Sequence, residues 1–401
     1  MTGPELFKLY ERFGDRVFFY SGGTLSVALF NWDDVRQVLS ASNADFIKGP
    51  FESVIGAGVG WGLLTQEGQS HKSSRHKFNS GFHSSAMDYL EPQICQTFDK
   101  NLATFTSETG FEALPALRRL THEITLRGIL GVHELEESKE FEEHLYWLAH
   151  FMTHGSFATN SVSQMDVETF IRARSRFLSY ADRVTQLIVD GGQIAEPTFG
   201  KVLGKEHSGP IVRGQGTHAQ VAQFLSAGTE TTASLLSSML FLHTQTPSDW
   251  SALKSAAEAD ESSELDARLD EALRLFPPAS ISTRVPTREV ELSGVTLPAG
   301  IQVFVSPYVT QRMEVYFDRP KEYDWARWMT QERDQRRGYF PFGFGPRMCI
   351  GYSAARHTAK SVLRLFTSSA YPGKFQAMPD YLEQYIVLGP SRAEKLYFSK
   401  V

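Results

Sequence analysis

Several features are scarce in this 401-residue chain, and each absence excludes a class of protein. The two cysteines, Cys95 and Cys349, are too few for the disulfide framework of a small secreted domain. No uninterrupted apolar run reaches the roughly 18 residues of a membrane-spanning helix. The net charge is −6, whereas a module that binds duplex nucleic acid usually has a basic surplus. We therefore expect a cytoplasmic protein with no nucleic-acid or membrane partner.

The N-terminus adds one qualification to this expectation. Residues 1–4 show no signal-peptide pattern. The chain begins close to its first expected helix, which leaves open a membrane anchor upstream of residue 1. The composition, 41% hydrophobic and 21% charged, is that of an ordinary globular protein with enough apolar material for a core.

Helical periodicity dominates the chain and predicts a mainly α fold with a minor β region. The apolar residues recur at helical spacing in five long segments. These segments are residues 113–131, 167–189, 219–243, 264–276 and 354–367.

Strand signals are fewer and predict two hairpins. Residues 17–20 and 25–29 form the first pair, and residues 289–297 and 301–305 form the second, around Pro-Ala-Gly. The stretch 190–217 is rich in Gly, Pro and polar residues and is either an interdomain linker or a surface loop within one domain.

The segment Phe-Gly-Phe-Gly-Pro-Arg-Met-Cys-Ile-Gly at residues 342–351 is the most informative part of the chain. Taken alone, Cys349 is most often a small buried hydrophobic residue. The surrounding glycines favour a second interpretation, because they let the backbone turn tightly and approach a flat, bulky group. Helical periodicity resumes after Cys349, so its sulfur lies near a helix N-terminus, where N–H groups favour a thiolate. With Arg347 able to bind a carboxylate, the segment suits an axial haem ligand.

This segment resembles the haem-binding signature of the cytochrome P-450 family, Phe-x-x-Gly-x-Arg-x-Cys-x-Gly. The matching positions are Phe342, Gly345, Arg347, Cys349 and Gly351. A chance match to five fixed positions, one of them a cysteine, has a probability on the order of 10⁻⁴ or less. The resemblance implies that Cys349 ligates the iron of haem b, that Arg347 binds a propionate and that Phe342 shields the sulfur.

Glu271 and Arg274 resemble a second family motif, Glu-x-x-Arg. At i,i+3 the two side chains share a helix face, and by themselves such pairs are usually solvated surface bridges. The resemblance implies instead a buried structural network whose third member is Arg327, although the family usually has Pro-Glu before that arginine and this chain has Trp-Ala.

The segment Ala-Gly-Thr-Glu-Thr-Thr at residues 227–232 resembles the family's oxygen-activation motif. Thr231 can donate to the carbonyl of Ala227, and Gly228 weakens the helix locally, which together open a notch for dioxygen and water. Taken alone, Thr231 is a threonine bonded to its own helix. The resemblance implies that Ala227 borders the cofactor and that Glu230 and Thr231 deliver the protons for O–O cleavage.

A fourth resemblance concerns residues that bind the haem propionates. His71 and Arg75 lie at i,i+4 and can reach one anionic group. They match the family's His-x-x-x-Arg, and Arg284 matches a further propionate position; without the family, His71 is a surface histidine. The chain departs from the family at Gln311-Arg312, where His-Arg is common, and at Thr358, where a Glu is common.

These resemblances span nearly the whole chain in the family's order and imply one domain over residues 1–401. They imply a haem-thiolate monooxygenase that inserts one oxygen atom of O2 into a small, largely apolar substrate. Electrons come from NAD(P)H only indirectly, through a separate ferredoxin- or flavodoxin-type donor, and we expect a monomer. The alternatives are a peroxide-using haem-thiolate enzyme, a haem-thiolate isomerase or dehydratase, and a non-enzymatic haem sensor.

Family position also predicts the residues that border the substrate. They are residues 48–63, Tyr146, Trp147, Phe151, Met152, Phe157, Gln223, Phe224, Ala227, 279–282 and 386–388.

Charge distribution predicts where the electron donor docks. Residues 68–87 and 338–379 contain no Asp or Glu, and both segments flank the haem in the family's fold. Such a positive patch steers an acidic partner, although a solvated basic face without a partner is the alternative. The basic residues concerned are Lys72, Arg75, Lys77, Arg347, Arg356, Lys360, Arg364 and Lys374.

Overall fold

The computed structural model describes residues 2–41, 45–133, 164–191, 198–259, 263–330 and 337–372. It also describes residues 141, 143 and 145 and four short strands between 382 and 400. Within these residues, no helix is long and apolar enough to cross a membrane.

Five long helices match the predicted periodic segments closely: α6 (Ala113–Ile124), α8 (Gln164–Val189), α10 (Gly216–His243), α12 (Ser263–Leu275) and α14 (Tyr352–Ser369). Two further long helices, α5 (Ser84–Phe105) and α11 (Pro247–Glu258), were not predicted. The shorter helices are α1 (Gly3–Phe13), α2 (Trp32–Ser40), α3 (Pro50–Val59), α4 (Gly68–Phe78), α9 (Phe199–Glu206) and α13 (Pro307–Thr310). Single turns are η1 (Asn79–Phe82), η2 (Thr125–Ile129), η3 (Trp325–Trp328) and η5 (Gly345–Arg347).

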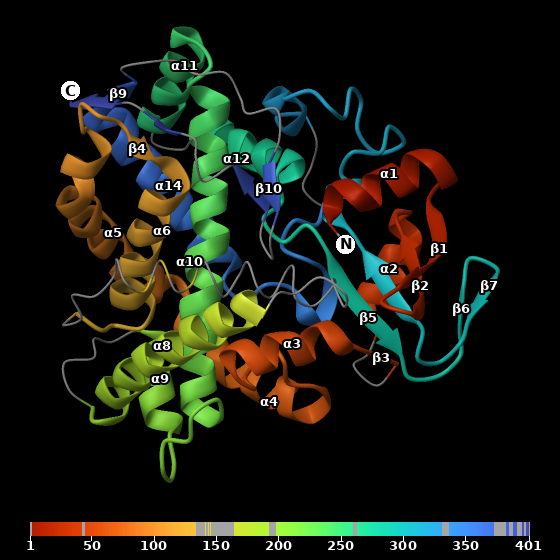
Figure 1. The fold of residues 1–401 in the computed structure, drawn as a ribbon. Coiled ribbons are helices and arrows are strands. Elements are labelled where there is room, and N and C mark those ends of the chain that lie inside the picture. The colour runs from red at the N-terminus through yellow and green to blue at the C-terminus, as the bar shows by residue number, and fades with distance from the viewer. Residues whose placement is uncertain are drawn as a thin grey trace.

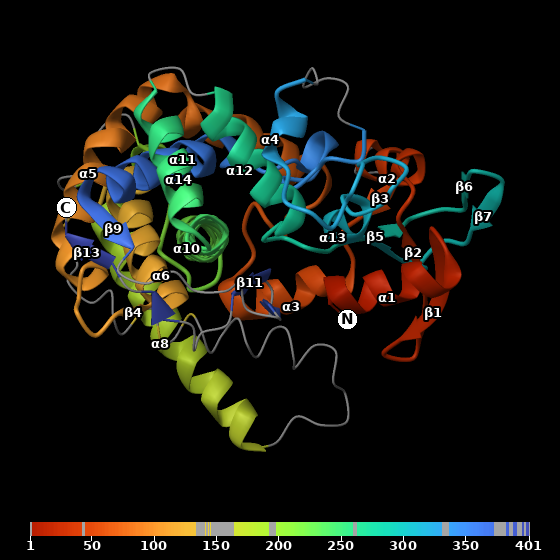
Figure 2. The same ribbon diagram turned by 90° about the horizontal axis from the view of Figure 1, so that it is seen from above.

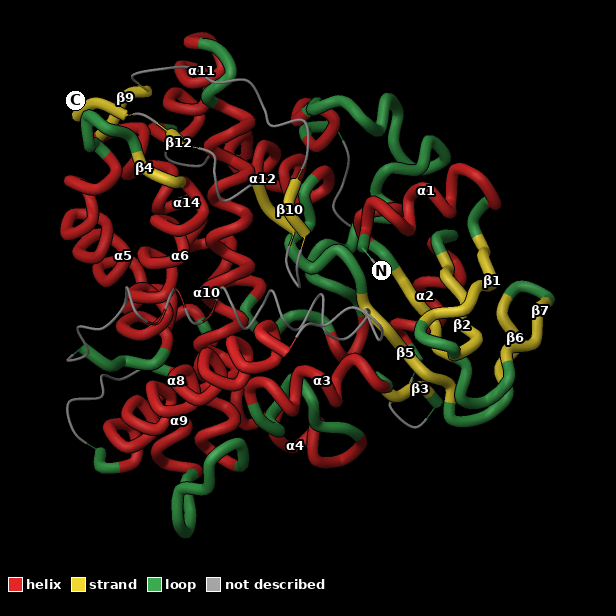
Figure 3. Tube along the Cα trace, in the orientation of Figure 1, coloured by secondary structure: helices red, strands yellow, loops and turns green. Residues whose placement is uncertain are grey.

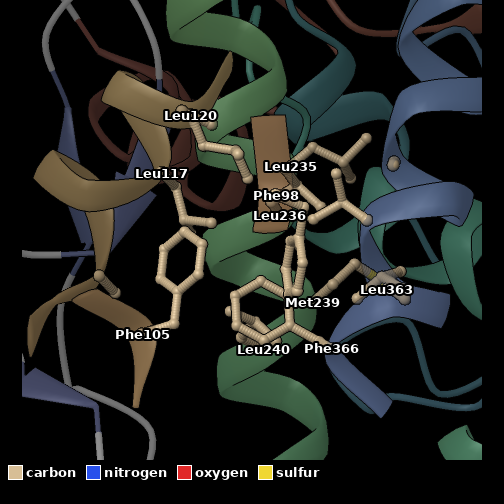
Figure 4. Packing of buried hydrophobic residues seen from close by; sticks show 14 of the residues in the cluster. Phe98, Phe105, Leu117, Leu120, Leu235, Leu236, Met239, Leu240, Leu363 and Phe366 are labelled. Atoms are coloured by element: carbon tan, nitrogen blue, oxygen red, sulfur yellow. The ribbon is translucent and has the colours of Figure 1, made fainter. Parts of the chain in front are cut away.

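Helix α10 runs through the molecule, with α5, α6 and α14 on one side and the small sheet with α1 and α2 on the other (Figure 1; Figure 3). Seen end-on, α10 lies among α6, α12 and α14 (Figure 2). The largest apolar cluster joins α10 to α5, α6 and α14 and includes Phe98, Phe105, Leu236, Leu240 and Phe366, all fully buried (Figure 4). This packing explains how a mostly apolar helix becomes the axis of the fold.

Capping residues in the sequence set several helix ends. Thr2 and Glu5 form a capping box at the start of α1, and the Thr246 side chain accepts from the Asp249 N–H at the start of α11. The segment predicted as one helix over 113–131 continues from α6 into the π-helical turn η2. The stretch 190–217, predicted as a linker or loop, contains α9, whose N-cap Thr198 accepts from the Lys201 N–H at 3.3 Å.

The main sheet has five strands in the order β1-β2-β8-β5-β3. These strands are β1 (Arg16–Ser21), β2 (Thr24–Leu29), β3 (Phe46–Ile47), β5 (Ser282–Pro286) and β8 (Gln302–Val305). The first predicted hairpin is present as β1 and β2, with Tyr20 opposite Leu25.

The second predicted hairpin is wrong. Strand β8 is buried along its whole length and pairs in parallel with β2 and antiparallel with β5. The hairpin lies earlier, between β6 (Val290–Leu292) and β7 (Val295–Leu297). Its turn residues Ser293 and Gly294 both have positive φ, 45° and 77°, as a tight two-residue hairpin turn needs.

Three two-stranded pairs complete the β structure of the described residues. They are β4 (Phe111–Glu112) with β12 (Lys395–Leu396), β9 (Ala370–Pro372) with β13 (Phe398–Lys400), and β10 (Leu382–Gln384) with β11 (Leu388–Pro390).

Candidate functional site

Cys349 lies in a tight turn between η5 and α14. Its N–H donates to the Phe342 carbonyl at 2.9 Å, and the Met348 N–H donates to the Gly345 carbonyl at 3.0 Å. Gly345 has φ +71°, and a Cβ at this position would lie 2.3 Å from the Leu39 carbonyl oxygen. The turn therefore requires glycine both for its backbone conformation and for its contact with α2.

The Cys349 thiol is accessible and yet surrounded by protein. The residue is exposed by surface area, but the atoms packed around the sulfur desolvate it and raise its pKa. The Gly351 N–H and the Arg75 guanidinium act in the opposite direction and favour the thiolate. Because desolvation raises the pKa of the thiol despite these two contacts, a further positive charge is needed to ionise it fully. A bound metal ion would supply that charge.

One face of the central helix α10 is also accessible. Ala227 is exposed although Leu225, Thr229 and Thr232 on the same helix are buried. Thr231 is half-buried, and its hydroxyl donates to the Ala227 carbonyl at 2.8 Å. The predicted threonine-to-carbonyl bond is therefore present, on the face of α10 that keeps accessible surface.

Helix α10 is continuous through Gly228, from Gly216 to His243, so no break accompanies this glycine. A Cβ at Gly228 would lie 2.7 Å from the Thr125 hydroxyl oxygen of η2. This glycine therefore permits close packing of two helical segments.

Glu230 lies on a different face of α10 from Thr231. It is only 5% exposed, and its Oε2 accepts from Nε of Arg118 on α6 at 2.9 Å. Its Oε1 lies 2.9 Å from the same nitrogen but has no hydrogen-bond partner among the described residues. Sequence analysis missed Arg118, because nothing in a single sequence indicates which of many arginines faces this carboxylate.

Basic residues gather beside the cysteine turn. His71 is 3% exposed, and its pKa is lowered to about 4, first by burial and then by Arg347, Lys48 and Arg75. Nη1 of Arg75 donates to the Met348 carbonyl at 2.6 Å, so α4 is bonded directly to the cysteine turn. Three cations around a neutral imidazole form a site suited to anionic groups such as carboxylates.

Glu67, at the N-cap of α4, is a member of this group that sequence analysis missed. Its carboxylate pairs with Arg347 and accepts from the Lys48 N–H at 2.8 Å. The remaining predicted propionate residue, Arg284, is 6% exposed on β5, where its Nη1 donates to Ser282 Oγ and the Thr283 carbonyl.

The predicted Glu271–Arg274 pair is present and completely buried. The two side chains form a bidentate ion pair with both N–O distances at 2.8 Å. Arg327 joins it at 3.3 Å from Glu271 Oε1. Trp328, which sequence analysis did not assign, donates its indole N–H to Glu271 at 2.8 Å.

Gln311 is also part of the support for this network. Its Nε2 donates to the Leu273 and Arg274 carbonyls, and its Oε1 accepts from the Phe340 N–H. The position noted only as a departure therefore ties the end of α12 to the segment that leads into the cysteine turn.

Comparison with known proteins identifies this arrangement. Residues 3–190 and 204–394 match the sequence model of the family described as Cytochrome P450. The chain belongs to the cytochrome P450 family.

Three of the relatives that the chain matches carry the names of a synthase, an oxygenase and an oxidase. Cyclooctatin synthase of Streptomyces melanosporofaciens is 27% identical over 79% of this chain and 74% of its own length. Pentalenene oxygenase of Streptomyces avermitilis is 25% identical over 88% and 83%, and 11-oxo-beta-amyrin 30-oxidase of Glycyrrhiza uralensis is 25% identical over 95% and 80%.

Solved cytochrome P450 structures share the fold. A six-coordinated cytochrome P450 from Thermus thermophilus superposes with a TM-score of 0.78 at 24% identity, covering 99% of this chain and 98% of that one. The haem domain of cytochrome P450DA gives a TM-score of 0.83 at 19% identity, over 99% and 92%. The predicted family and mainly α fold are confirmed, and the protein is a haem-thiolate monooxygenase.

The residues of this P450 fit a bound haem. The accessible thiol of Cys349 can ligate its iron, and the accessible face of α10 at Ala227 leaves room for its ring. The cations beside the cysteine turn can bind its two carboxylates. A Cβ at Gly351 would lie 3.9 Å from the Cys349 sulfur, an ordinary van der Waals contact, so the space beside the sulfur does not by itself require glycine here.

The predicted substrate residues of the P450 differ in exposure, and within residues 48–63 Trp61 is 52% exposed whereas Val59 and Leu63 are buried. Ala227 and Ala279 are exposed, and Phe224, Ile281 and Ser282 are half-buried. Gln223 is 2% exposed, and its amide is bonded to protein backbone instead of facing a substrate. Tyr146, Trp147, Phe151, Met152, Phe157 and residues 386–387 lie outside the described residues.

The predicted positive patch is mostly neutralised. Arg356 is buried and pairs with Asp266 and Asp270, and Lys360 pairs with Asp266 at 3.2 Å. Lys77 pairs with Glu206 of α9. The acids come from segments far away in the chain, so counting acids within residues 68–87 and 338–379 could not show them. Lys374 lies outside the described residues.

Proposed function

We propose that this P450 oxygenates a hydrocarbon-rich terpenoid, with Cys349 as the haem ligand. The observation that carries the site assignment is the pairing of an accessible thiol at Cys349 with an accessible face of α10 at Ala227 and Thr231. The names of the relatives support the substrate class, since pentalenene and 11-oxo-beta-amyrin are terpenoids. The half-buried Phe224 and Ile281 offer the apolar contacts that such a substrate needs.

The proposed roles follow from these contacts. His71, Arg75, Arg347 and Arg284 hold the haem carboxylates, and Gly345 and Gly351 keep the turn close to the ring. Phe342, which packs edge-on against Tyr352 with ring centroids 4.8 Å apart, covers the sulfur. When bound, the haem supplies the chemistry that activates dioxygen and transfers one oxygen atom to the substrate.

Thr231 and Glu230 manage the protons in this proposal. The Thr231 hydroxyl is held toward the accessible face by its bond to the Ala227 carbonyl, where it can orient a water molecule. When the Glu230 carboxylate rotates away from Arg118, its Oε1, which accepts no hydrogen bond from the described residues, can exchange a proton with that water. Electrons come from a separate ferredoxin- or flavodoxin-type donor, and residues 1–401 act as one domain.

One observation favours a second candidate, a peroxide-using haem-thiolate enzyme. Glu230 is bonded to Arg118 and not to Thr231, whereas use of dioxygen requires an acid that can deliver protons. The two candidates differ in their oxidant. Product formed with hydrogen peroxide alone, and not with dioxygen and an electron donor, would support the second.

Two variants test the assignment. Cys349→His should abolish the far-red-shifted Soret band that the reduced carbonyl complex of a thiolate-ligated haem shows, and an unchanged band would refute Cys349 as ligand. Thr231→Ala should retain haem but lower the product formed per electron at least about tenfold, with the difference recovered as hydrogen peroxide. A terpenoid panel screened for the low-spin to high-spin shift tests the substrate class.

A further inference from the structure

Two glutamines of α10 hold the turn Gly60–Thr65 by its backbone. Gln220 and Gln223 lie at i,i+3 on one face of the helix and are 4% and 2% exposed. Gln220 Oε1 accepts from the Leu63 N–H at 2.9 Å, and Gln223 Oε1 accepts from the Leu64 N–H at 2.8 Å. These bonds use side-chain amides where a helix core position normally carries an apolar residue.

Gln223 makes two further bonds to the same turn. Its Nε2 donates to the Gly60 carbonyl at 2.7 Å and to the Thr65 hydroxyl at 3.2 Å. The buried amide therefore has three protein partners, all of them between residues 60 and 65. An amide so occupied is not offered to a ligand.

The glycines of the turn fit this contact. A Cβ at Gly62 would lie 2.8 Å from Gln223 Oε1 and 2.9 Å from Gln220 Oε1, so a larger residue would displace both amides. Gly60 has φ +93°, and a Cβ there would lie 2.8 Å from Gly214 Cα. Glycine at both positions lets the backbone approach α10 and the segment before it closely.

The turn connects the accessible face of α10 to the cysteine turn. Ala227 follows Gln223 by one helical turn, about 6 Å along the axis. On the other side, the Leu64 carbonyl accepts from Lys48 Nζ, and the Lys48 N–H donates to Glu67, which pairs with Arg347. The backbone at Leu64 is thus held at both its N–H and its carbonyl, while its side chain is 40% exposed.

We propose that Gln220 and Gln223 are positioning residues that fix the turn Gly60–Thr65 as one wall of the substrate space. The wall selects ligands by shape, because its backbone is held in place and does not adapt to each ligand. The proposal rests on the proposed function only in that the space beside Ala227 receives the substrate. A purely structural role predicts changed stability without changed ligand selectivity.

Hydrogen–deuterium exchange of the haem-loaded protein tests the attachment directly. Gln223→Leu should speed exchange of the peptide that contains Leu63 and Leu64 at least about tenfold, because the turn loses the buried hydrogen bonds that hold it against α10. Gln223→Glu keeps the acceptor for the Leu64 N–H but loses the donor to Gly60, so its effect should be smaller. Gln186→Leu, at an exposed position of α8, is the matched control and should leave this peptide unchanged. Unchanged exchange in Gln223→Leu would overturn the proposal.

Ligand binding tests the selectivity. Imidazole and 4-phenylimidazole both bind ferric haem and shift its Soret band, but only the second extends a ring into the space beside Ala227. In Gln223→Leu and in the milder Gln220→Leu, the dissociation constant of imidazole should change less than about twofold and that of 4-phenylimidazole about fivefold or more. Equal changes for both ligands would refute the wall while leaving the attachment intact. Failure of the haem assignment is distinguishable, since wild-type protein would then show no Soret shift with either ligand.

Discussion

Two buried glutamate–arginine pairs lie in different regions of this P450 and differ in how completely they are bonded. In the first, Arg274 uses all five of its N–H donors, two on Glu271 and three on the carbonyls of Gln311, Pro320 and Glu322. In the second, Glu230 accepts one hydrogen bond from Arg118, and its other oxygen has no hydrogen-bond partner within the described part of the chain.

The difference indicates what each pair can do. Glu271 also accepts from the Asp324 N–H and the Trp328 indole, so any rotation of its carboxylate breaks several charge-assisted bonds. Such a group holds η3 against α12 and has no freedom to move protons. Glu230 sacrifices one bond when it rotates, and it lies next in sequence to Thr231, whose side chain reaches the accessible face of α10. Two buried pairs of the same chemistry therefore support a fixed role for Glu271 and a mobile role for Glu230.

The first prediction, with the largest effect, removes the carboxylate of Glu271, the more completely hydrogen-bonded of the two glutamates. Glu271→Ala leaves the Arg274 guanidinium buried without a counter-charge, which should lower the free energy of unfolding by about 3–5 kcal/mol. We expect little soluble, haem-replete protein. Glu264→Ala is the control on the same helix, because Glu264 pairs with Arg268 near the surface and is 37% exposed. Equal haem content in the two variants would contradict the comparison.

The second prediction breaks the pair between Glu230 and Arg118. Arg118→Met should cost less stability than Glu271→Ala, about 1–3 kcal/mol, because Glu230 can turn toward other polar groups. It should change the product formed per electron, since the carboxylate is no longer held toward α6. Thr121→Val is the control: it removes another α6–α10 bond, from Thr121 Oγ1 to the Thr229 carbonyl at 2.9 Å, without touching Glu230. Identical coupling of electrons to product in both variants would show that Arg118 only supports packing.

Local patterns in the sequence predicted the parts of the site that lie within one segment. The cysteine turn, the Glu271–Arg274 spacing and the bond from Thr231 to Ala227 each depend on residues a few positions apart. Five of the long helices were predictable for the same reason, since their apolar period is local, whereas α5 and α11 were missed. That residues 1–401 form one domain stays a prediction, as do the roles of the site residues.

Contacts between distant segments could not be predicted. Strand β8 was assigned to the strand nearest in sequence, although it pairs with β2, about 275 residues earlier. Gln223 was assigned to the substrate from its position in the family, which does not indicate the backbone that its amide meets. Lys360 was assigned to an open basic face, because Asp266 lies 94 residues away. In each case the partner lies in a segment that is distant in the sequence.

The third prediction compares two buried histidines, one near each pair. Burial lowers the pKa of His122 on α6 to about 3 and that of His243 on α10 to about 4. An unfolded histidine binds a proton near pH 6.5, so both groups stabilise the fold fully above that pH and lose this contribution as the pH falls toward 3 to 4. Replacing either by Phe should flatten the fall in thermal midpoint between pH 7 and pH 5.

At neutral pH the two replacements should differ. His243 bonds to the Met239 carbonyl and to the Tyr323 hydroxyl, at 2.8 and 3.0 Å. His122 bonds to the Tyr180 hydroxyl at 2.7 Å, and its Nδ1 has no hydrogen-bond partner among the residues described. At about 1 kcal/mol per bond, His243→Phe should be the more destabilising. Equal losses of stability at pH 7.5 would contradict the view that the more completely hydrogen-bonded groups are the structural ones.

The fourth prediction, with the smallest effect, extends the comparison to cations at the surface. Lys360 is held by Asp266 at 3.2 Å, whereas exposed Lys72 on α4 has no ion pair among the described residues. Only an unpaired charge adds to the field that steers an acidic electron donor. Lys72→Gln should therefore lower the rate of reduction by such a donor about two- to threefold at low ionic strength, and Lys360→Gln should not. Stopped-flow reduction at about 20 and about 300 mM salt separates the cases, since the difference should vanish at the higher concentration, where screening lengths are only a few ångströms. A larger effect for Lys360→Gln would place the donor over α14 and show that the pair with Asp266 opens on docking.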